Sequence, residues 1–288
     1  MWKHVVSYAI IGLNMAPSPD FKSHQDAILL HHQQAQFFED RHSELSRGEV
    51  FAGTFNFGRS RLMKIFDQWL PPVASPVAFL DVGCGTGHDL LHWSARGYSC
   101  SGVEPADGMI EVARKLNPAL RIEQATVSCL PFPDSSFDVV IAIEVLRYLD
   151  NEHAALAEML RVIKPGGQLI FTATSPVSLC LFPLINQISG RIKLPTLIHL
   201  LQHFHSVSSL RRMLVSNGAD LVEVKGAGFV TALHLLGDRL LPSRWMEGIY
   251  RWCSPLEDRL SRHSQLAGLS LHMAIRAVKC NPGSASAR

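Results

Sequence analysis

Residues 81–87 read Asp-Val-Gly-Cys-Gly-Thr-Gly, follow the apolar run 77–80 and precede an amphipathic segment that begins at His88. Glycines at alternate positions let a ligand approach the backbone where a Cβ atom would collide with it. Amide groups at the start of the following helix can receive a carboxylate or a pyrophosphate. The generic dinucleotide fingerprint is not met, because His88 stands where its third glycine would lie, and the chain has no Gly-Lys pair of a phosphate loop. These residues therefore indicate a nucleoside-binding site of unspecified type.

Outward from this loop, strand-like and helix-like patterns alternate. Strands are expected at 77–81, 98–103, 121–125, 137–143, 168–174, 220–225 and 269–279, with helices at 88–96, 109–116, 154–163 and 208–217. Residues 24–70 read as helical around a loop at 51–58. Such alternation is typical of a parallel sheet covered by helices on both faces. We predict an α/β, Rossmann-like, doubly wound fold with seven mostly parallel strands, N-terminal helices and a helical lid.

The same patterns divide the chain into a core and its additions. Two apolar stretches rich in Pro and Gly interrupt the rhythm after strands, where ligands bind at the carboxyl edge of such sheets. We expect a flexible N-terminus (1–20), an N-terminal helical cap (21–72), the cofactor-binding core (73–175), a lid insertion (176–205), the continued core (206–228), a second lid insertion (229–267), the last strand (268–280) and a tail (281–288).

Composition narrows the function class. The 288 residues are 47% hydrophobic and 18% charged, with 27 Lys plus Arg against 25 Asp plus Glu, so a globular fold is expected and no nucleic-acid footprint is visible. The six cysteines form no CxxC pair and no zinc-like set, which favours reduced thiols in the cytoplasm and no bound metal. The apolar run 5–13 is too short to span a bilayer, so stable membrane insertion is not expected, while peripheral membrane contact is left open.

A second landmark is Glu104, which ends the second expected strand nineteen residues after Gly85. A carboxylate there can accept hydrogen bonds from both hydroxyls of a ribose. With this residue, four motifs in order resemble those of the class I S-adenosylmethionine-dependent methyltransferases: 81–87, 103–109, 130–138 and 160–167. The resemblance covers residues 77–225, and weakly extends to 279.

The resemblance implies S-adenosyl-L-methionine as the cofactor and a role for each matching position. The glycines would pass beneath its methionine part, Asp81 would anchor its ammonium group, and Glu104 would hold its ribose. Thr126 stands where many relatives have Asp, so a contact with adenine there would lack the charge. The implied cofactor-binding set is Asp81, Gly83, Cys84, Gly85, Gly87, Glu104, Pro105, Met109, Thr126, Val127 and Glu144.

The segment 144–149 resembles a motif of quinone-type O-methyltransferases that has His at the place of Tyr148. Tyrosine, with a pKa of about 10, orients a hydroxyl better than it removes a proton. A base, if one is needed, is sought among His199, His203 and His205, although each also reads as a structural residue. Arg59 and His88 are read either as ligand contacts or as an exposed arginine and a packing residue.

We expect an enzyme that methylates an oxygen of a hydrophobic small molecule such as a phenol, quinone, polyketide or lipid-like compound. The reason is the apolar composition of 176–205 and 229–265, which would enclose such an acceptor unless these stretches pack on each other as extra core. Enzymes of this fold that methylate carbon, nitrogen or sulfur, and a non-catalytic cofactor-binding protein, remain alternatives. A nicotinamide dehydrogenase is disfavoured by the glycine spacing.

Overall fold

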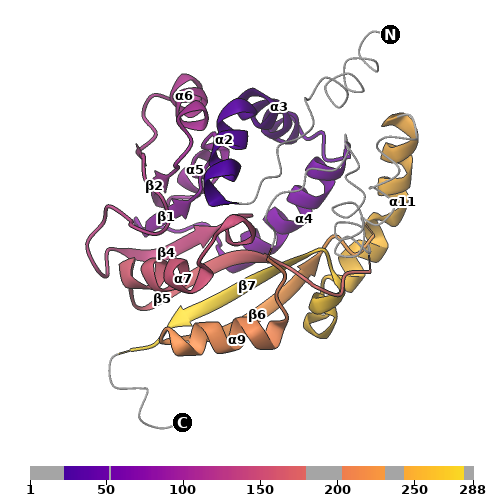
Figure 1. Cartoon of the computed structure of the whole chain (residues 1–288). Helices are drawn as coiled ribbons and strands as arrows, with labels where there is room; N and C mark the ends of the chain where they lie inside the picture. The colour runs from indigo at the N-terminus through magenta and orange to yellow at the C-terminus, as the bar shows by residue number, and fades with distance from the viewer. Residues whose placement is uncertain (1–22, 52, 180–202, 231–242, 282–288) are drawn as a thin grey trace.

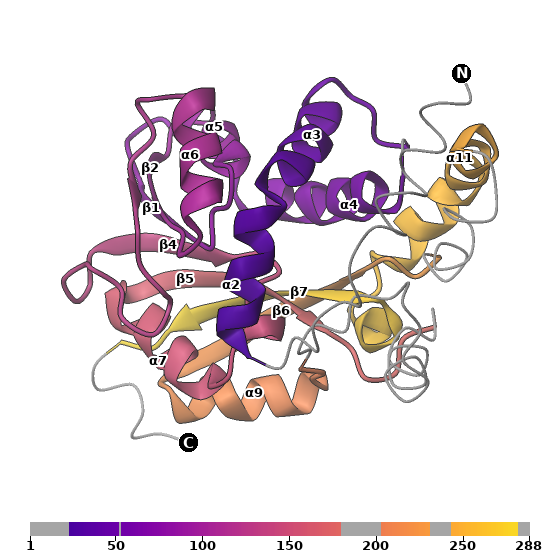
Figure 2. The same ribbon diagram turned by 45° about the horizontal axis from the view of Figure 1, so that its top comes forward.

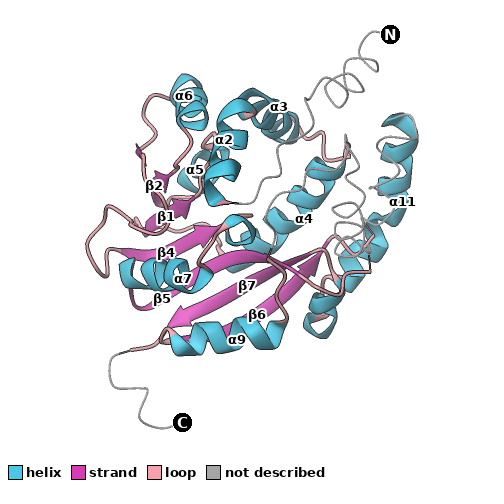
Figure 3. Ribbon diagram, viewed as in Figure 1, coloured by secondary structure: helices cyan, strands magenta, loops and turns pink. Residues whose placement is uncertain are grey.

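The computed structural model describes residues 23–51, 53–179, 203–230 and 243–281, which form a central sheet flanked by helices (Figures 1 and 3). The sheet has seven strands in the order β3-β2-β1-β4-β5-β7-β6. Its strands are β1 (Ala78–Val82), β2 (Ser99–Val103), β3 (Ile122–Glu123), β4 (Phe137–Ala142), β5 (Ile163–Thr174), β6 (Ala219–Ala227) and β7 (His272–Lys279). β7 pairs antiparallel with both β5 and β6, whereas β1 to β5 pair in parallel. The predicted fold class is confirmed.

Helices cover both faces of this sheet because successive strand residues point to opposite sides. The described helices are α2 (His24–Gln33), α3 (Ala35–Ser46), α4 (Thr54–Trp69), α5 (His88–Ser94), α6 (Asp107–Leu116), α7 (Glu152–Val162), α9 (Val207–Ser216) and α11 (Ser243–Leu260), with short 3-10 helices η1 (Leu146–Tyr148) and η3 (Ser264–Leu269). Leu80 and Val140 pack with α7 and α9, whereas their neighbours Phe79 and Val139 pack with α4 and with Trp93 of α5.

Local caps explain where several helices begin. Ser23 and Asp26 form a capping box at the start of α2. The side chains of Asn151 and Ser206 accept backbone N–H groups at the starts of α7 and α9. Gly87 precedes α5 with φ of 81°, a left-handed conformation that glycine adopts without steric cost.

Three expected boundaries were wrong. α4 already begins at Thr54, inside the loop expected at 51–58, because Asn56 donates to Glu44 and to the Glu49 carbonyl and thereby holds this turn in place. β5 begins at Ile163, and its register shifts opposite Phe137 and Val139 to accommodate the expected turn 164–167. The last strand begins at His272, because residues 264–269 form η3. Residues 1–22, 180–202, 231–242 and 282–288, with the expectations that fall on them, lie outside the described residues.

Helix α2 crosses the sheet at the edge where the parallel strands end (Figure 2). Near its start, the His24 backbone N–H donates to Asp150, in the segment after β4. Near its end, the imidazole Nδ1 of His32 accepts from the backbone N–H of Gly108 at the start of α6. Since β2, β1 and β4 are neighbours in the sheet, α2 spans the place where the glycine loop follows β1. Within the described ranges, no helix is both long and apolar enough to cross a membrane.

Candidate cofactor site

The glycine loop turns sharply after β1. Gly83, Gly85 and Gly87 all have positive φ, at 74°, 54° and 81°. A Cβ atom at Gly83 would lie 2.5 Å from Cγ2 of Val145, so packing also requires glycine there. At Gly85, by contrast, no heavy atom of the described residues, its two chain neighbours aside, lies within 4 Å of the place that a Cβ atom would take. The backbone of Gly85 therefore borders open space, as a backbone that receives a ligand must.

Two buried polar atoms on this turn lack a hydrogen-bond partner in the described part of the chain: Oδ2 of Asp81 and Oγ1 of Thr86. Asp81 is only 2% exposed. Burial, reinforced by the charges of Asp89 and Glu104, raises the pKa of the Asp81 carboxyl well above its usual range. Because an unpaired buried polar atom costs about 1–3 kcal/mol, these two atoms indicate a polar or cationic ligand at the loop.

Glu104 ties the end of β2 to the glycine loop. Its two oxygens accept backbone N–H groups of Gly85 and Ala106, each at 2.9 Å. Burial raises the pKa of this carboxyl, although these two hydrogen bonds act in the opposite direction. Each oxygen keeps a further acceptor position, so a ribose hydroxyl can be added without breaking either hydrogen bond.

The other residues expected around the cofactor have more varied surroundings. Met109, four residues after Pro105, is buried in one cluster with Ala35 of α3 and so belongs to the contact between core and N-terminal helices. Cys84 is buried against Leu90 and Ile110, and burial raises the pKa of its thiol well above the usual range.

Thr126 and Val127, the two residues expected at the edge of the adenine, have different surroundings. Val127 is a core residue packed beneath the sheet edge. Thr126 is half-buried, and its carbonyl accepts from the backbone N–H of Cys129. A role of these two residues at adenine stays a prediction.

Glu144 follows β4 in a left-handed conformation, with φ of 60°, which is uncommon for a residue other than glycine. Its carboxylate pairs with Arg147 and with Nδ1 of His272 and accepts the hydroxyl of Thr172 at 2.9 Å. Burial would raise the pKa of Glu144, but the charges of His272 and Arg147 outweigh burial and hold it far below its usual range. The carboxylate is thus engaged by protein groups, and its predicted contact with the cofactor remains untested.

Tyr148 lies in η1, directly after this ionic cluster. The Arg147 guanidinium lies over its ring at 4.9 Å from the centroid. Burial raises the pKa of the phenol, so Tyr148 stays protonated at neutral pH and serves as a hydrogen-bond donor.

The backbone N–H of His203 donates to the carbonyl of Arg147, directly before Tyr148, whereas the side chains of His203 and His205 turn to Glu152. His203 and His205 both contact the same oxygen of Glu152, at 3.0 and 3.1 Å, near the start of α7. His205 is also held by a backbone hydrogen bond to Thr174. His199 lies outside the described residues.

The histidine beside Tyr148 is instead His31 of α2, which the sequence analysis did not single out. Its ring lies edge-on to Tyr148, with centroids 5.5 Å apart, and stacks on Phe38. Nδ1 donates to the Ala27 carbonyl at 2.6 Å, which leaves Nε2 as an acceptor. Burial, aided by the charges of Arg147 and His24, lowers its pKa. In the sequence, His31 is one of two adjacent histidines in a segment that reads as helical, and no local pattern indicates that it contacts Tyr148.

Arg59 and His88 join the N-terminal helices to the loop. Arg59 of α4 pairs with Asp89 of α5, and its Nε atom has no partner in the described part of the chain. His88 contacts Glu39 of α3 at 2.9 Å and stacks on His42. The packing interpretation therefore describes the observed contacts of His88, and Arg59 is largely buried rather than an exposed surface arginine.

Residues 80–171 match a protein family described as "Methyltransferase domain". This chain contains a class I S-adenosylmethionine-dependent methyltransferase domain. The match spans β1 to β5 and includes the glycine loop, Glu104 and Tyr148. The methyltransferase domain thus confirms the predicted family and its cofactor, S-adenosylmethionine.

Relatives of the domain have diverse names. A malonyl-[acyl-carrier protein] O-methyltransferase of Serratia marcescens is 35% identical over 100 residues, 35% of this chain and 39% of the relative. A ubiquinone/menaquinone biosynthesis C-methyltransferase of Shewanella pealeana is 33% identical over 139 residues, 45% of this chain and 55% of the relative. The chain therefore matches well under two thirds of the length of either relative.

Solved structures support the fold over a longer range. A structure from Thermotoga maritima, described as a possible histamine N-methyltransferase, covers 86% of this chain and 99% of its own, with a TM-score of 0.52 and 20% identity. A methyltransferase solved with its Trm112 activator from Haloferax volcanii covers 87% and 95%, with a TM-score of 0.56 and 17% identity. At such identities the likeness concerns the fold of the methyltransferase domain and not its substrate.

Proposed function

We propose that this protein is an S-adenosylmethionine-dependent methyltransferase that transfers a methyl group to an oxygen of a hydrophobic small molecule. The observation that carries the cofactor half of this proposal is the unpartnered, buried Oδ2 atom of Asp81 beside the open space at Gly85. An ammonium group would satisfy Asp81, and the backbone of Gly85 would allow the rest of the methionine part to lie close. Glu104 would hold the ribose.

Bound S-adenosylmethionine supplies an activated methyl group, so the protein needs no covalent nucleophile. Its tasks are to align the acceptor and to exclude water, which together account for much of the catalysis. Helix α2 serves both tasks, because it spans the loop and is attached on both sides of it, at Asp150 and at Gly108.

The acceptor side of the proposed site contains a donor and a base. Tyr148 remains a phenol and can orient an acceptor oxygen. His31 is neutral at pH 7, and its unprotonated Nε2 atom can take the proton of an acceptor hydroxyl. This pairing of aromatic and basic groups, stacked with Phe38, suits an aromatic hydroxyl better than a charged sugar or amino acid.

Methylation at carbon remains the second candidate. The Shewanella relative is named a C-methyltransferase and matches 139 residues of this chain, more than the 100 residues of the O-methyltransferase relative. A neutral base beside Tyr148 would also remove a proton from a carbon acid.

The decisive experiment uses methyl-labelled cofactor with a panel of phenols, hydroxyquinones, long-chain carboxylates and hydrophilic amines. Mass spectrometry and NMR of the product identify both the acceptor and the methylated atom. We expect label on oxygen of an apolar acceptor. Label on carbon would favour the second candidate, and preferential labelling of small hydrophilic acceptors would contradict the proposal.

Replacing His31 tests its role as base. With an accepted substrate, we expect His31→Gln to lower kcat about a hundredfold while cofactor affinity stays the same. The wild-type rate should rise with pH through the lowered pKa of His31, below 6.5, and then level off, because only the neutral ring accepts a proton. The variant should lose this rise. His153→Gln, on the exposed side of α7, is the matched control, and an unchanged profile in His31→Gln would remove His31 from catalysis.

A further inference from the structure

Helix α11 has two apolar faces, of which one is packed into the protein. Met246 and Tyr250 are buried with Phe57 of α4, and the rings of Phe57 and Tyr250 stack at 5.0 Å. Buried Glu257 secures the same side by accepting the backbone N–H groups of residues 228–230. The helix is therefore fixed on the core through one side only.

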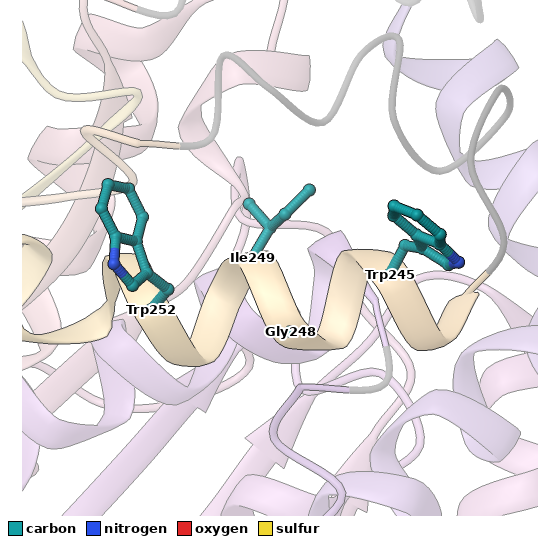
Figure 4. Close-up of a pocket in the computed structure, with 4 residues that line it drawn as sticks. All are labelled: Trp245, Gly248, Ile249 and Trp252. Atoms are coloured by element: carbon teal, nitrogen blue, oxygen red, sulfur yellow. The ribbon is translucent and has the colours of Figure 1, made fainter.

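The other apolar face lies on the opposite side of the helix, and Ile249 at its border also packs against Phe57, Met246 and Tyr250. Trp245, Gly248, Ile249 and Trp252 line a shallow hollow along it (Figure 4), and Leu256 continues the stripe one turn further. Trp252 is 82% exposed and Trp245 is 59% exposed. We call these five residues the tryptophan face. Two indoles exposed to this extent on one contiguous patch mark an interaction surface rather than a scattered apolar residue.

The tryptophan face itself carries the basic residue Arg259, while Glu247 offsets the charge of Arg251 at its border. Arg259 follows Trp252 by seven residues, so it shares the stripe, and exposed Arg251 lies at its border. The acidic residues of α11 are engaged elsewhere: Glu247 pairs with Arg251, Asp258 pairs with Arg61 and Lys64, and Glu257 is buried. In the described part of the helix, the face thus combines indoles and aliphatic groups with arginine and has no carboxylate of its own.

The position of α11 relates this face to the proposed catalytic edge. Glu257 holds residues 228–230, which directly follow the end of β6. β6 runs in the same direction as β5 and β1, because both β5 and β6 are antiparallel to β7. The tryptophan face therefore lies at the sheet edge from which the glycine loop also emerges.

We propose that the tryptophan face docks on the surface of an anionic lipid membrane, with its indoles at the level of the headgroups. Trp is enriched at that depth, where its apolar ring and polar N–H each find suitable surroundings. Arginine beside it attracts anionic headgroups. A twofold contact with a second copy would bring the arginines of two identical faces together without a carboxylate between them. Binding of this kind needs no membrane-spanning helix.

Vesicle sedimentation tests the proposal with the full chain. We expect binding to vesicles of phosphatidylcholine plus phosphatidylglycerol, and much weaker binding to phosphatidylcholine vesicles. Added salt should weaken the binding because it screens the arginines. Trp252→Ala and Trp245→Ala should each lower partitioning about tenfold, and Val215→Ala, an exposed apolar residue of α9, should leave it unchanged. Arg259→Gln should weaken binding, whereas Arg212→Gln on α9 should not.

Three results would overturn the proposal. The first is vesicle binding that is absent, or unaffected by the tryptophan and Arg259 variants. The second is a dimer of the wild type that dissociates in Trp252→Ala, which would assign the face to a second copy. The third concerns quenching of tryptophan fluorescence by iodide in the absence of vesicles. If iodide quenches the wild type and Trp252→Phe to the same extent, iodide does not reach Trp252, and the chain itself covers the face. None of these measurements uses methyl transfer, so the inference stands or falls independently of the proposed activity.

Discussion

Among the described residues, one buried carboxylate oxygen of Asp81 has no hydrogen-bond partner, and the pKa of Asp81 is raised mainly because it is buried. A buried carboxylate without a cation is costly, so the free protein favours the protonated form. A ligand ammonium reverses this preference. We therefore expect this residue to couple cofactor binding to proton release.

We expect calorimetry in two buffers of different ionisation enthalpy to show proton release when S-adenosylmethionine or its demethylated product binds. Affinity should increase as the pH rises through the raised pKa of Asp81, because the complex requires the ionised carboxylate. Asp81→Asn should weaken binding by about 1–3 kcal/mol and abolish the proton release. Equal proton release in wild type and variant would exclude Asp81 as its source.

Gly85 borders the open space of the proposed cofactor site with φ of 54°. Gly85→Val should abolish cofactor binding in calorimetry, because its side chain would enter this space and its backbone conformation is unfavourable for valine. Gly218→Val is the matched control: Gly218 has φ of 74° and equally open surroundings, but it lies after α9, away from the loop. If both variants lose binding equally, backbone strain and not ligand contact explains the loss.

At the scale of elements, α11 depends on one buried side chain. Glu257 accepts three backbone N–H groups after β6, at 2.6, 3.2 and 3.1 Å. The carboxylate thereby receives the backbone donors that directly follow the strand. Burial raises the pKa of Glu257, and the three hydrogen bonds partly oppose that effect.

Glu257→Ala should lower the free energy of unfolding by about 3–5 kcal/mol, because it removes a buried carboxylate that accepts three backbone hydrogen bonds. Glu257→Gln, which keeps one acceptor oxygen, should cost less. Denaturant titration measures both values. Glu247→Gln, which removes an exposed pair with Arg251, should change stability by less than about 0.5 kcal/mol, and a similar loss in all three variants would contradict the anchoring role.

At the scale of the whole molecule, the N-terminal helices are joined to the methyltransferase core through titratable groups. His42 of α3 stacks on His88, at the start of α5. Burial, together with the charge of Arg59, lowers the pKa of His42 to about 4. Protonation of this ring therefore opposes the contact between the helical cap and the glycine loop.

Since the unfolded chain binds a proton at His42 more readily than the folded one, this residue's stabilising contribution is present above pH 6.5 and is lost as the pH falls toward about 4. His42→Gln should flatten the pH dependence of the unfolding midpoint in that window. The exposed His263→Gln variant serves as the control. Carboxyl groups with a raised pKa make the protein less stable as the pH rises, which is the opposite of the effect of His42. The relevant measurement is therefore the difference between variant and wild type, and no difference would contradict the role of His42.

The sequence by itself determined the class of fold and the location of the glycine loop. Alternating apolar strands and amphipathic helices are local patterns, and a backbone that must turn with positive φ requires glycine wherever the turn occurs. Glu104 could be proposed because it directly follows β2, whereas the role of Asp81 came from the family resemblance. The element boundaries were less certain, because contacts such as that of Asn56 with Glu44 extend a helix beyond its local signal.

Only the tertiary structure decided which distant groups meet. His31 and Tyr148 lie in contact although 116 residues separate them along the chain, because α2 crosses the strand ends. His203 and His205 both contact Glu152, and the backbone of His203 also donates to Arg147, directly before Tyr148. The exposed face of α11 likewise follows from the burial of its opposite side against α4. The spacing of apolar residues along the chain predicts whether a segment is a helix or a strand. Which segments then become neighbours depends on the free energy of packing all elements together, and no short stretch of sequence reveals that.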